Sequence, residues 1–141
     1  MILDEAHAYF RVTEFGDDPD VVTRLVGVAP TTAWVKAKGH GAHHGLWELA
    51  SSLDGAAAPA SHVAELVETL AKHANGVRKA ADRYQAGIWC AVYYEDATPS
   101  IPLGPELLRT LAELGLGLTL DLYFVGGEAE KPRPPAEPED F

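Results

Sequence analysis

The sequence predicts an α+β protein in which helices cover one face of a largely antiparallel sheet. Strand patterns and helical patterns follow one another along the chain, and the first and last strand patterns, 8–13 and 118–124, match each other. In each, alternate residues are apolar, while the others mix aromatic with charged side chains. The length of 141 residues suits one domain whose core requires neither a disulfide nor a metal. We expect that domain to span residues 1–126.

A short helix and a hairpin follow the first strand. Asp18-Pro19 is a typical N-cap and first-turn pair, and Gly27 is a typical helix end. Two strand patterns come next, joined by a segment rich in glycine and histidine at 38–45. These two strands cover residues 32–37 and 46–51.

The next predicted helix has one apolar face. Ser61 is a suitable cap for it, and the apolar positions are Val63, Leu66, Val67 and Leu70. Asn75-Gly76 is expected to end or kink this helix before a second helical piece at 77–84. An aromatic and β-branched run at 88–94 is typical of a strand in the middle of a sheet.

A last helix precedes the final strand. Gly104-Pro105 begins it and Gly115 ends it, with leucines at core spacing, namely Leu107, Leu108, Leu111 and Leu114. The element order, β-α-β-β-α-β-α-β, contains a ferredoxin-like β-α-β-β-α-β core with an added C-terminal helix and strand. We expect the helices to cover the sheet face lined by Phe10, Val12, Ile88, Val92, Leu120 and Leu122, and to leave the other face open.

Charge and cysteine content restrict the partners and the compartment. The formal net charge is −10, from 21 acidic and 11 basic residues, and such a field repels nucleic acid and anionic membranes while it favours basic partners. Cys90 is the single cysteine, and residues 1–5 carry no targeting pattern, so a cytoplasmic protein is expected. The stretch 127–141 is acidic and rich in proline, and we expect it to be a disordered tail.

Several segments, taken in their order, carry a resemblance to a known family. They are Ala8-Tyr9-Phe10-Arg11-Val12, 25–31, Trp34, 45–49, Pro102-Leu103, 111–115 and 120–123. Together they resemble a family of small bacterial proteins catalogued as domain of unknown function 4279. The resemblance covers nearly everything from Ala8 to Tyr123 and implies the element order above and a bacterial origin. It implies no reaction, substrate or catalytic residue. Some small acidic proteins of this kind are immunity proteins that neutralise toxins, and that function is suggested for this chain by analogy alone.

Candidate chemical sites are few. His40 and His43, with a carboxylate such as Glu48, have a spacing that permits zinc. The glycines around them, and the lack of any zinc motif, favour a mobile, metal-free loop at 38–45. His62 and His73 are expected at the surface or at helix ends, and Cys90 is expected to be a buried, inert thiol. No catalytic residue, metal or cofactor is predicted.

The open sheet face is the candidate binding site. Its predicted residues are Tyr9, Arg11, Trp89, Tyr93, Asp121 and Tyr123. Glu95 shares their strand parity, the facing of Trp34 and Trp47 is undecided, and an ion pair between Arg11 and Asp121 is expected. The structural alternative is that these aromatic residues only pack together, with that ion pair as a clasp.

Two functions fit these features. The first is a non-catalytic protein-interaction module, for instance an immunity-type protein that binds a basic partner, or a chain that binds a second copy of itself. The second is a regulatory domain that binds a small molecule, if the face closes into a pocket where Arg11 clamps an anion. RNA stacking on the aromatic face is a weaker third reading, since no basic patch accompanies it.

Overall fold

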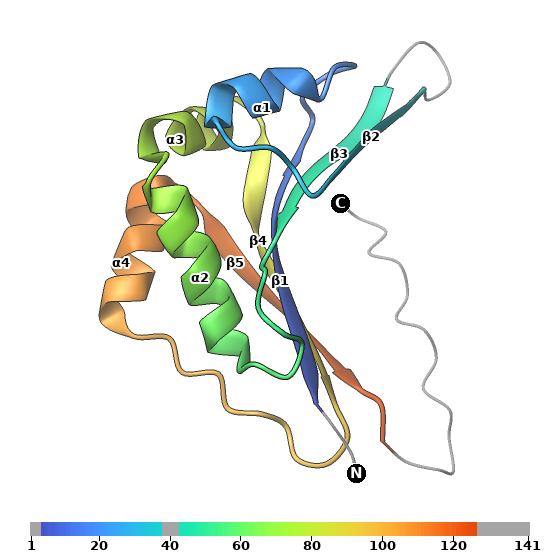
Figure 1. Cartoon of the computed structure of the whole chain (residues 1–141), viewed down its shortest axis with the longest axis vertical. Coiled ribbons are helices and arrows are strands. Elements are labelled where there is room, and N and C mark those ends of the chain that lie inside the picture. Colours follow the sequence, from blue (N-terminus) through green and yellow to red (C-terminus); the bar gives the residue numbers. More distant parts are fainter. Residues whose placement is uncertain (1–3, 38–42, 127–141) are drawn as a thin grey trace.

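The computed structural model describes residues 4–37 and 43–126, and within them the predicted α+β class is confirmed. The elements follow the predicted order and alternate between sheet and helix. They are β1 (Glu5–Thr13), α1 (Asp20–Val26), β2 (Thr32–Ala37), β3 (His43–Ala50), α2 (Pro59–Ala71), α3 (Ala74–Arg83), β4 (Gln85–Tyr94), α4 (Pro105–Leu114) and β5 (Gly117–Phe124). The four helices lie on one side of the sheet (Figure 1).

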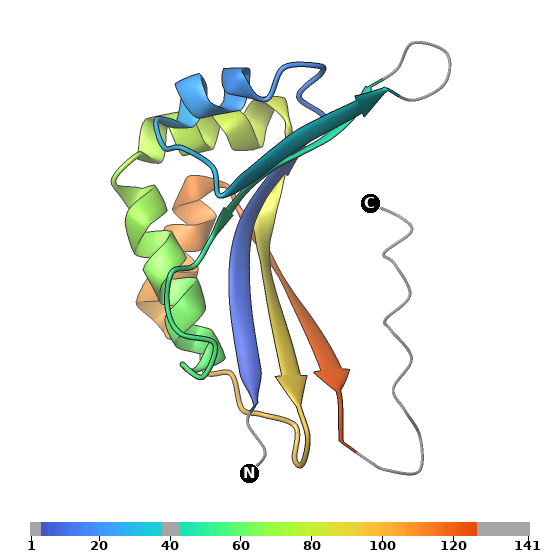
Figure 2. The ribbon, with the colours of Figure 1, turned by 45° about the vertical axis from the view of Figure 1, so that its right-hand side comes forward.

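The five strands form one sheet in the order β2-β3-β1-β4-β5. All neighbours are antiparallel except β4 and β5, which are parallel. The chain turns back through α4 before it adds β5, which is the long connection that a parallel pair requires. Figure 2 shows β2 and β5 at the two edges and the face without helices turned away from α1 to α4.

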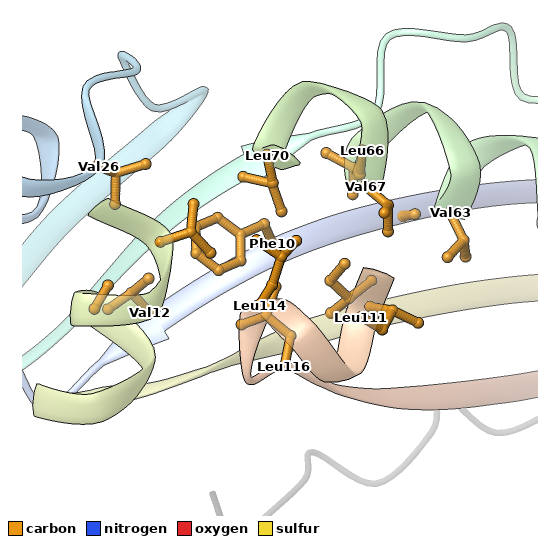
Figure 3. Close-up of a cluster of buried hydrophobic side chains, with 14 of the residues drawn as sticks. Phe10, Val12, Val26, Val63, Leu66, Val67, Leu70, Leu111, Leu114 and Leu116 are labelled. Carbon is orange, nitrogen blue, oxygen red and sulfur yellow. The ribbon is translucent and has the colours of Figure 1, made fainter. Parts of the chain in front are cut away.

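Strand alternation builds the core as predicted in β1. Ala6, Ala8, Phe10 and Val12 are buried, while the residues between them stay partly exposed. Figure 3 shows Phe10 and Val12 among apolar side chains that come from the helices, with Leu70 and Leu114 close by. Burial of such side chains contributes roughly 1.5–3 kcal/mol each, so this layer fixes which sheet face is covered.

For the leucines of β5, the prediction gave the correct sheet face but was wrong in expecting the helices to bury them. Leu120 pairs with Cys90 and Leu122 with Val92, so both leucines lie on the helix side of the sheet. However, their exposed fractions are 39% and 43%. β5 begins beside α4 and then runs away from it (Figure 1), so its C-terminal half has no helix above it.

The break between α2 and α3 differs from the prediction. It lies at Lys72 and His73, and Asn75-Gly76 belongs to the first turn of α3. Gly76 has a packing reason instead, because a Cβ added there would lie 2.1 Å from the carbonyl oxygen of Leu25. The glycine therefore permits the close approach of α1 and α3. Similarly, α2 begins at Pro59 after Ala58, so Ser61 is not its cap.

Candidate functional site

The open face of the sheet carries all six predicted binding residues. Registers place Tyr9 opposite Trp89 and Tyr93 beside Tyr123, with side chains that share the face away from the helices. Each of these four aromatic residues is partly exposed. The alternation of β1, β4 and β5 thus puts aromatic and charged side chains on one surface, as the sequence indicated.

Arg11 lies at the centre of a tight cluster on this face. Its guanidinium carbon is 4.9 Å from the ring centroid of Tyr9 and 5.5 Å from that of Trp89. Both distances fall within the range of cation–π attraction. We call Tyr9, Arg11, Glu48 and Trp89 the Arg11 cluster.

Glu48 fixes the arginine in this position. Arg11 Nε donates to Glu48 Oε2 at 2.5 Å, and the two residues are direct cross-strand partners on β1 and β3. The Arg11 side chain is 31% exposed and that of Glu48 is 12% exposed. A partly buried, charge-assisted bond of this kind holds the guanidinium more firmly than a solvated surface pair would.

The Trp89 ring packs against a glycine. Gly87 is the cross-strand partner of Arg11, and a Cβ added at Gly87 would lie 3.2 Å from Cζ3 of Trp89. The indole therefore packs closely over the backbone at Gly87, where a larger side chain would crowd it. The ring, the guanidinium and the phenol of Tyr9 then form one continuous surface.

A second aromatic group lies at the other end of the face. Tyr93 and Tyr123 stack with ring centroids 5.0 Å apart and ring planes 26° apart. The pair Ala91 and Asp121 lies between this stack and the row that contains Trp89. The six predicted residues thus form two groups on one face, with Asp121 between them.

Two tyrosines of this surface resist ionisation. Burial raises the pKa of Tyr9, and the carboxylate of Glu48 raises it further, while Arg11 acts in the opposite direction. Burial also raises the pKa of Tyr123, with a smaller contribution from Asp121. Both phenols are therefore neutral hydrogen-bond donors at neutral pH.

The predicted ion pair between Arg11 and Asp121 does not form, because Arg11 pairs with Glu48. The two tryptophans whose sheet face the sequence left undecided lie on opposite faces of the sheet. Trp34 lies on the open face of β2, with its ring 5.5 Å from His44, whereas Trp47 is fully buried on the helix side. Trp47 Nε1 donates to Thr23 Oγ1 at 2.9 Å.

From the sequence, Glu48 is considered only as a metal ligand, and His62 is expected at the surface or at a helix end. Glu48 faces Arg11 because of a register between strands 37 residues apart, and a single sequence does not give that register. His62 does lie near the start of α2, but it is fully buried, so the expected surface position is wrong. It precedes Leu66 by four residues and therefore shares the apolar face of α2, which is a signal that the sequence did contain.

His62 belongs to a buried hydrogen-bond network. Its Nε2 lies 3.1 Å from the carbonyl oxygen of Asp54, which can only accept, so Nε2 carries the proton. Nδ1 then accepts from the hydroxyl of Ser51 at 2.6 Å, and Ser51 Oγ accepts from the backbone N–H of Ala8. Burial lowers the pKa of His62, so the ring is neutral at neutral pH. With every polar atom occupied, this network serves structure.

No metal site is formed by the described residues, where no three His, Cys, Asp or Glu side chains converge. The predicted ligand His40 lies outside those residues, as does the side chain of His43, so the expected metal-free loop at 38–45 is not described in full. Cys90 is fully buried, as predicted, and burial raises the pKa of its thiol to about 11. It is therefore not a nucleophile at neutral pH.

A shallow hollow lies elsewhere, between α3 and α4. Its volume is about 550 Å³, and its lining includes Arg78, Lys79, Asp82 and Glu113. Charges of both signs lie side by side there, and the hollow is far more open than a typical ligand pocket. It does not coincide with the predicted binding residues.

Comparison with known proteins identifies the family alone. Within the described chain, no helix has the length and apolar character needed to cross a membrane. No curated protein and no solved structure matches the sequence. The model of the family described as "Domain of unknown function (DUF4279)" matches residues 4–125, which run from the start of β1 to the end of β5. The chain thus belongs to the DUF4279 family.

Proposed function

We propose that this protein is a non-catalytic protein-interaction module that binds its partner through the open sheet face. The observation that carries the proposal is the Arg11 cluster, in which Glu48 and two aromatic rings hold an arginine whose side chain remains 31% exposed. Arginine, tyrosine and tryptophan are the residues most enriched at interface hot spots. An arginine that is already ordered loses little side-chain entropy on binding.

The electrostatics of the chain favour a basic partner. The net charge is −10, and the carboxylate of Asp121 lies on the same face as the Arg11 cluster. A basic protein would be attracted at long range by this field and would then be oriented by the fixed guanidinium and the rings. A bacterial, cytoplasmic immunity protein against a basic toxin is the form of this function that we favour. The face, rather than the segment 127–141, is the proposed contact.

The geometry favours a protein over a small molecule. The six predicted binding residues lie along three neighbouring strands, β1, β4 and β5, in two groups with Asp121 between them. A small ligand needs groups that converge on one enclosed volume. An extended strip suits the broad contact of a protein surface.

A finer description of the fold is also part of the proposal. We propose that β1 to β4, with the helices between them, form a ferredoxin-like unit to which α4 and β5 are added. The order β2-β3-β1-β4 and the antiparallel pairing of these strands support it. An experimental structure that superposes this unit on ferredoxin-like domains would establish it.

Site-specific photo-crosslinking tests the binding face. A photoreactive phenylalanine analogue at Ala91, on the open face, should give an adduct with a discrete partner in the native cell. The same analogue at Ala112, exposed on α4, is the matched control and should not. Adducts formed only from position 112 would contradict the proposal.

The identified partner then allows a quantitative test. Arg11→Ala should weaken binding about 30-fold or more, measured by calorimetry, if the guanidinium is a desolvated hot spot. Arg109→Ala, which removes an exposed arginine on α4, should leave the affinity unchanged. Circular dichroism melts of both variants separate lost binding from lost folding. An unchanged affinity in a folded Arg11→Ala protein would remove the Arg11 cluster from the interface.

A further inference from the structure

β5 is an edge strand that lacks the usual protection against pairing. It spans eight residues and contains no proline, lysine or arginine. Within residues 4–37 and 43–126, β4 is its one neighbouring strand. The opposite edge, β2, has six residues and carries Lys36, and lysine is a common device that keeps an edge strand from pairing. Of the two edges, β5 is therefore the one more open to pairing with another strand.

Exposed apolar side chains gather at this edge. Seven large apolar residues of the described chain are exposed, and four of them follow one another at the end of the fold: Leu120, Leu122, Phe124 and Val125. The first three alternate along β5 on its helix side. Leu108, exposed on α4, precedes the same strand. Isolated exposed leucines are ordinary, but a contiguous row on an unpaired edge is typical of an interaction site.

The other side of the same strand is polar. Thr119, Asp121 and Tyr123 alternate on the open face, and Asp121 is the only charged residue in β5. Among the described residues, no cation lies within ion-pair distance of Asp121. A strand added beside β5 would therefore meet an apolar row on one side and a carboxylate on the other.

We propose that the β5 edge binds an extended segment of another protein in which apolar and basic residues alternate. Backbone hydrogen bonds to the free edge would supply affinity, and the two rows of side chains would supply selectivity. Apolar residues of the segment would cover Leu120 and Leu122, while a lysine or arginine between them would pair with Asp121 across the strands. This surface is distinct from the Arg11 cluster, so the proposal goes beyond the function proposed above and does not depend on it.

Charge argues for a foreign segment over a second copy. Two copies paired through β5 would join two chains of net charge −10, and neither β5 has a basic residue to place opposite Asp121. In the central antiparallel register, the two Asp121 side chains would face each other directly, which is destabilising. A basic segment turns the same carboxylate into a favourable contact.

A pair of synthetic peptides tests the mode of binding. The probe is a capped eight-residue peptide that alternates isoleucine with lysine, and its control has the same sequence with every backbone nitrogen methylated. Both carry the same charge and side chains, but the control has no backbone donor for a ladder. The unmodified peptide should bind about 10-fold more tightly, with amide shifts and slowed hydrogen exchange in β5. Equal binding of the two peptides would overturn the proposal, because it would indicate charge attraction alone.

Variants of the protein assign the contact to β5. Asp121→Asn should weaken binding of the lysine peptide about three-fold, and Leu122→Thr should weaken it while the strand propensity is kept. Arg11→Ala and Lys36→Ala should leave it unchanged, which separates this site from the Arg11 cluster and from the β2 edge. Shifts confined to residues outside β5 would overturn the proposal. A dimer at micromolar concentration that Leu122→Thr abolishes, measured by light scattering without peptide, would assign the edge to a second copy instead.

Discussion

Ser51 and His62 are joined by a hydrogen bond of 2.6 Å that ties the end of β3 to α2. The imidazole is fully buried and accepts this bond at Nδ1, while Nε2 donates to the carbonyl oxygen of Asp54. The ring must be neutral to make both bonds in this way. The stability of the fold is therefore linked to the protonation of one histidine.

Acid should destabilise the protein through His62. Its pKa is lowered in the folded state below the ordinary 6.5, so the unfolded chain binds the proton more readily. The contribution of this neutral ring is complete above pH 6.5 and is lost as pH falls below it, by up to about 1.4 kcal/mol per pH unit. Denaturant melts between pH 7.5 and 5 should show this loss.

The control for that measurement is His62→Gln, whose amide also has a donor and an acceptor. The variant should be less stable at pH 7.5 but should lose less free energy of unfolding over the same interval. His7, Glu65 and Asp54 lie near the ring and remain in both proteins, so the difference between the two profiles reports on His62. Parallel profiles would show that another group controls the acid response.

Glu48 should control both the order of Arg11 and the ionisation of Tyr9. Glu48→Gln removes a carboxylate that raises the pKa of Tyr9 and leaves Arg11, which lowers it, in place. The Tyr9 phenol should then ionise at lower pH, which difference absorbance at 295 nm against a Tyr9→Phe reference can follow. The variant should also lose about 1–2 kcal/mol of stability, because a partly buried arginine loses its anion. An unchanged titration would place Glu48 away from Tyr9 in solution.

Gly76→Ala should destabilise the protein although alanine is the better helix former. The added methyl would lie 2.1 Å from the Leu25 carbonyl oxygen and 3.0 Å from the Val26 Cα, and both are backbone atoms of α1. The two helices would have to separate, at a cost of about 2–3 kcal/mol, which exceeds the gain of about 1 kcal/mol from helix propensity. Thermal melts give the comparison.

The matched control is Gly117→Ala, where an added Cβ has nothing within 4 Å. This variant should melt within a few degrees of the unmodified protein. If Gly76→Ala melted at the same or a higher temperature, the close approach of α1 and α3 would be wrong.

The single thiol should be protected in the native state. Cys90 is fully buried and burial raises its pKa to about 11, so a disulfide reagent at pH 8 should react with it only as fast as the protein opens. In denaturant the same reagent should react at once with one thiol per chain. Fast reaction of the folded protein would contradict the packing of β4.

The sequence predicted which sheet face each side chain occupies better than it predicted which of those side chains a helix buries. Alternation in β1 and β5 correctly told which side chains share a face, because the period of two is a property of the strand itself. Whether Leu120 is buried depends on where α4 lies above the strand, which alternation does not encode. Strand parity correctly predicted that Arg11 lies on the open face, but its ion-pair partner depends on a register between distant segments.

The central position of β1 has a consequence for how the chain is made. Residues of β1 pair with β4 in a register that joins Glu5 to Tyr93 and Thr13 to Gln85, and they also pair with β3. Of the five strands of this sheet, β1 is synthesised first, and most of the domain must follow before both of its neighbours are present. Contacts so distant in sequence slow folding and lengthen the time for which apolar strands are exposed. Nascent chains that stop before β4 should consequently depend on chaperones, while chains that extend past it should fold by themselves.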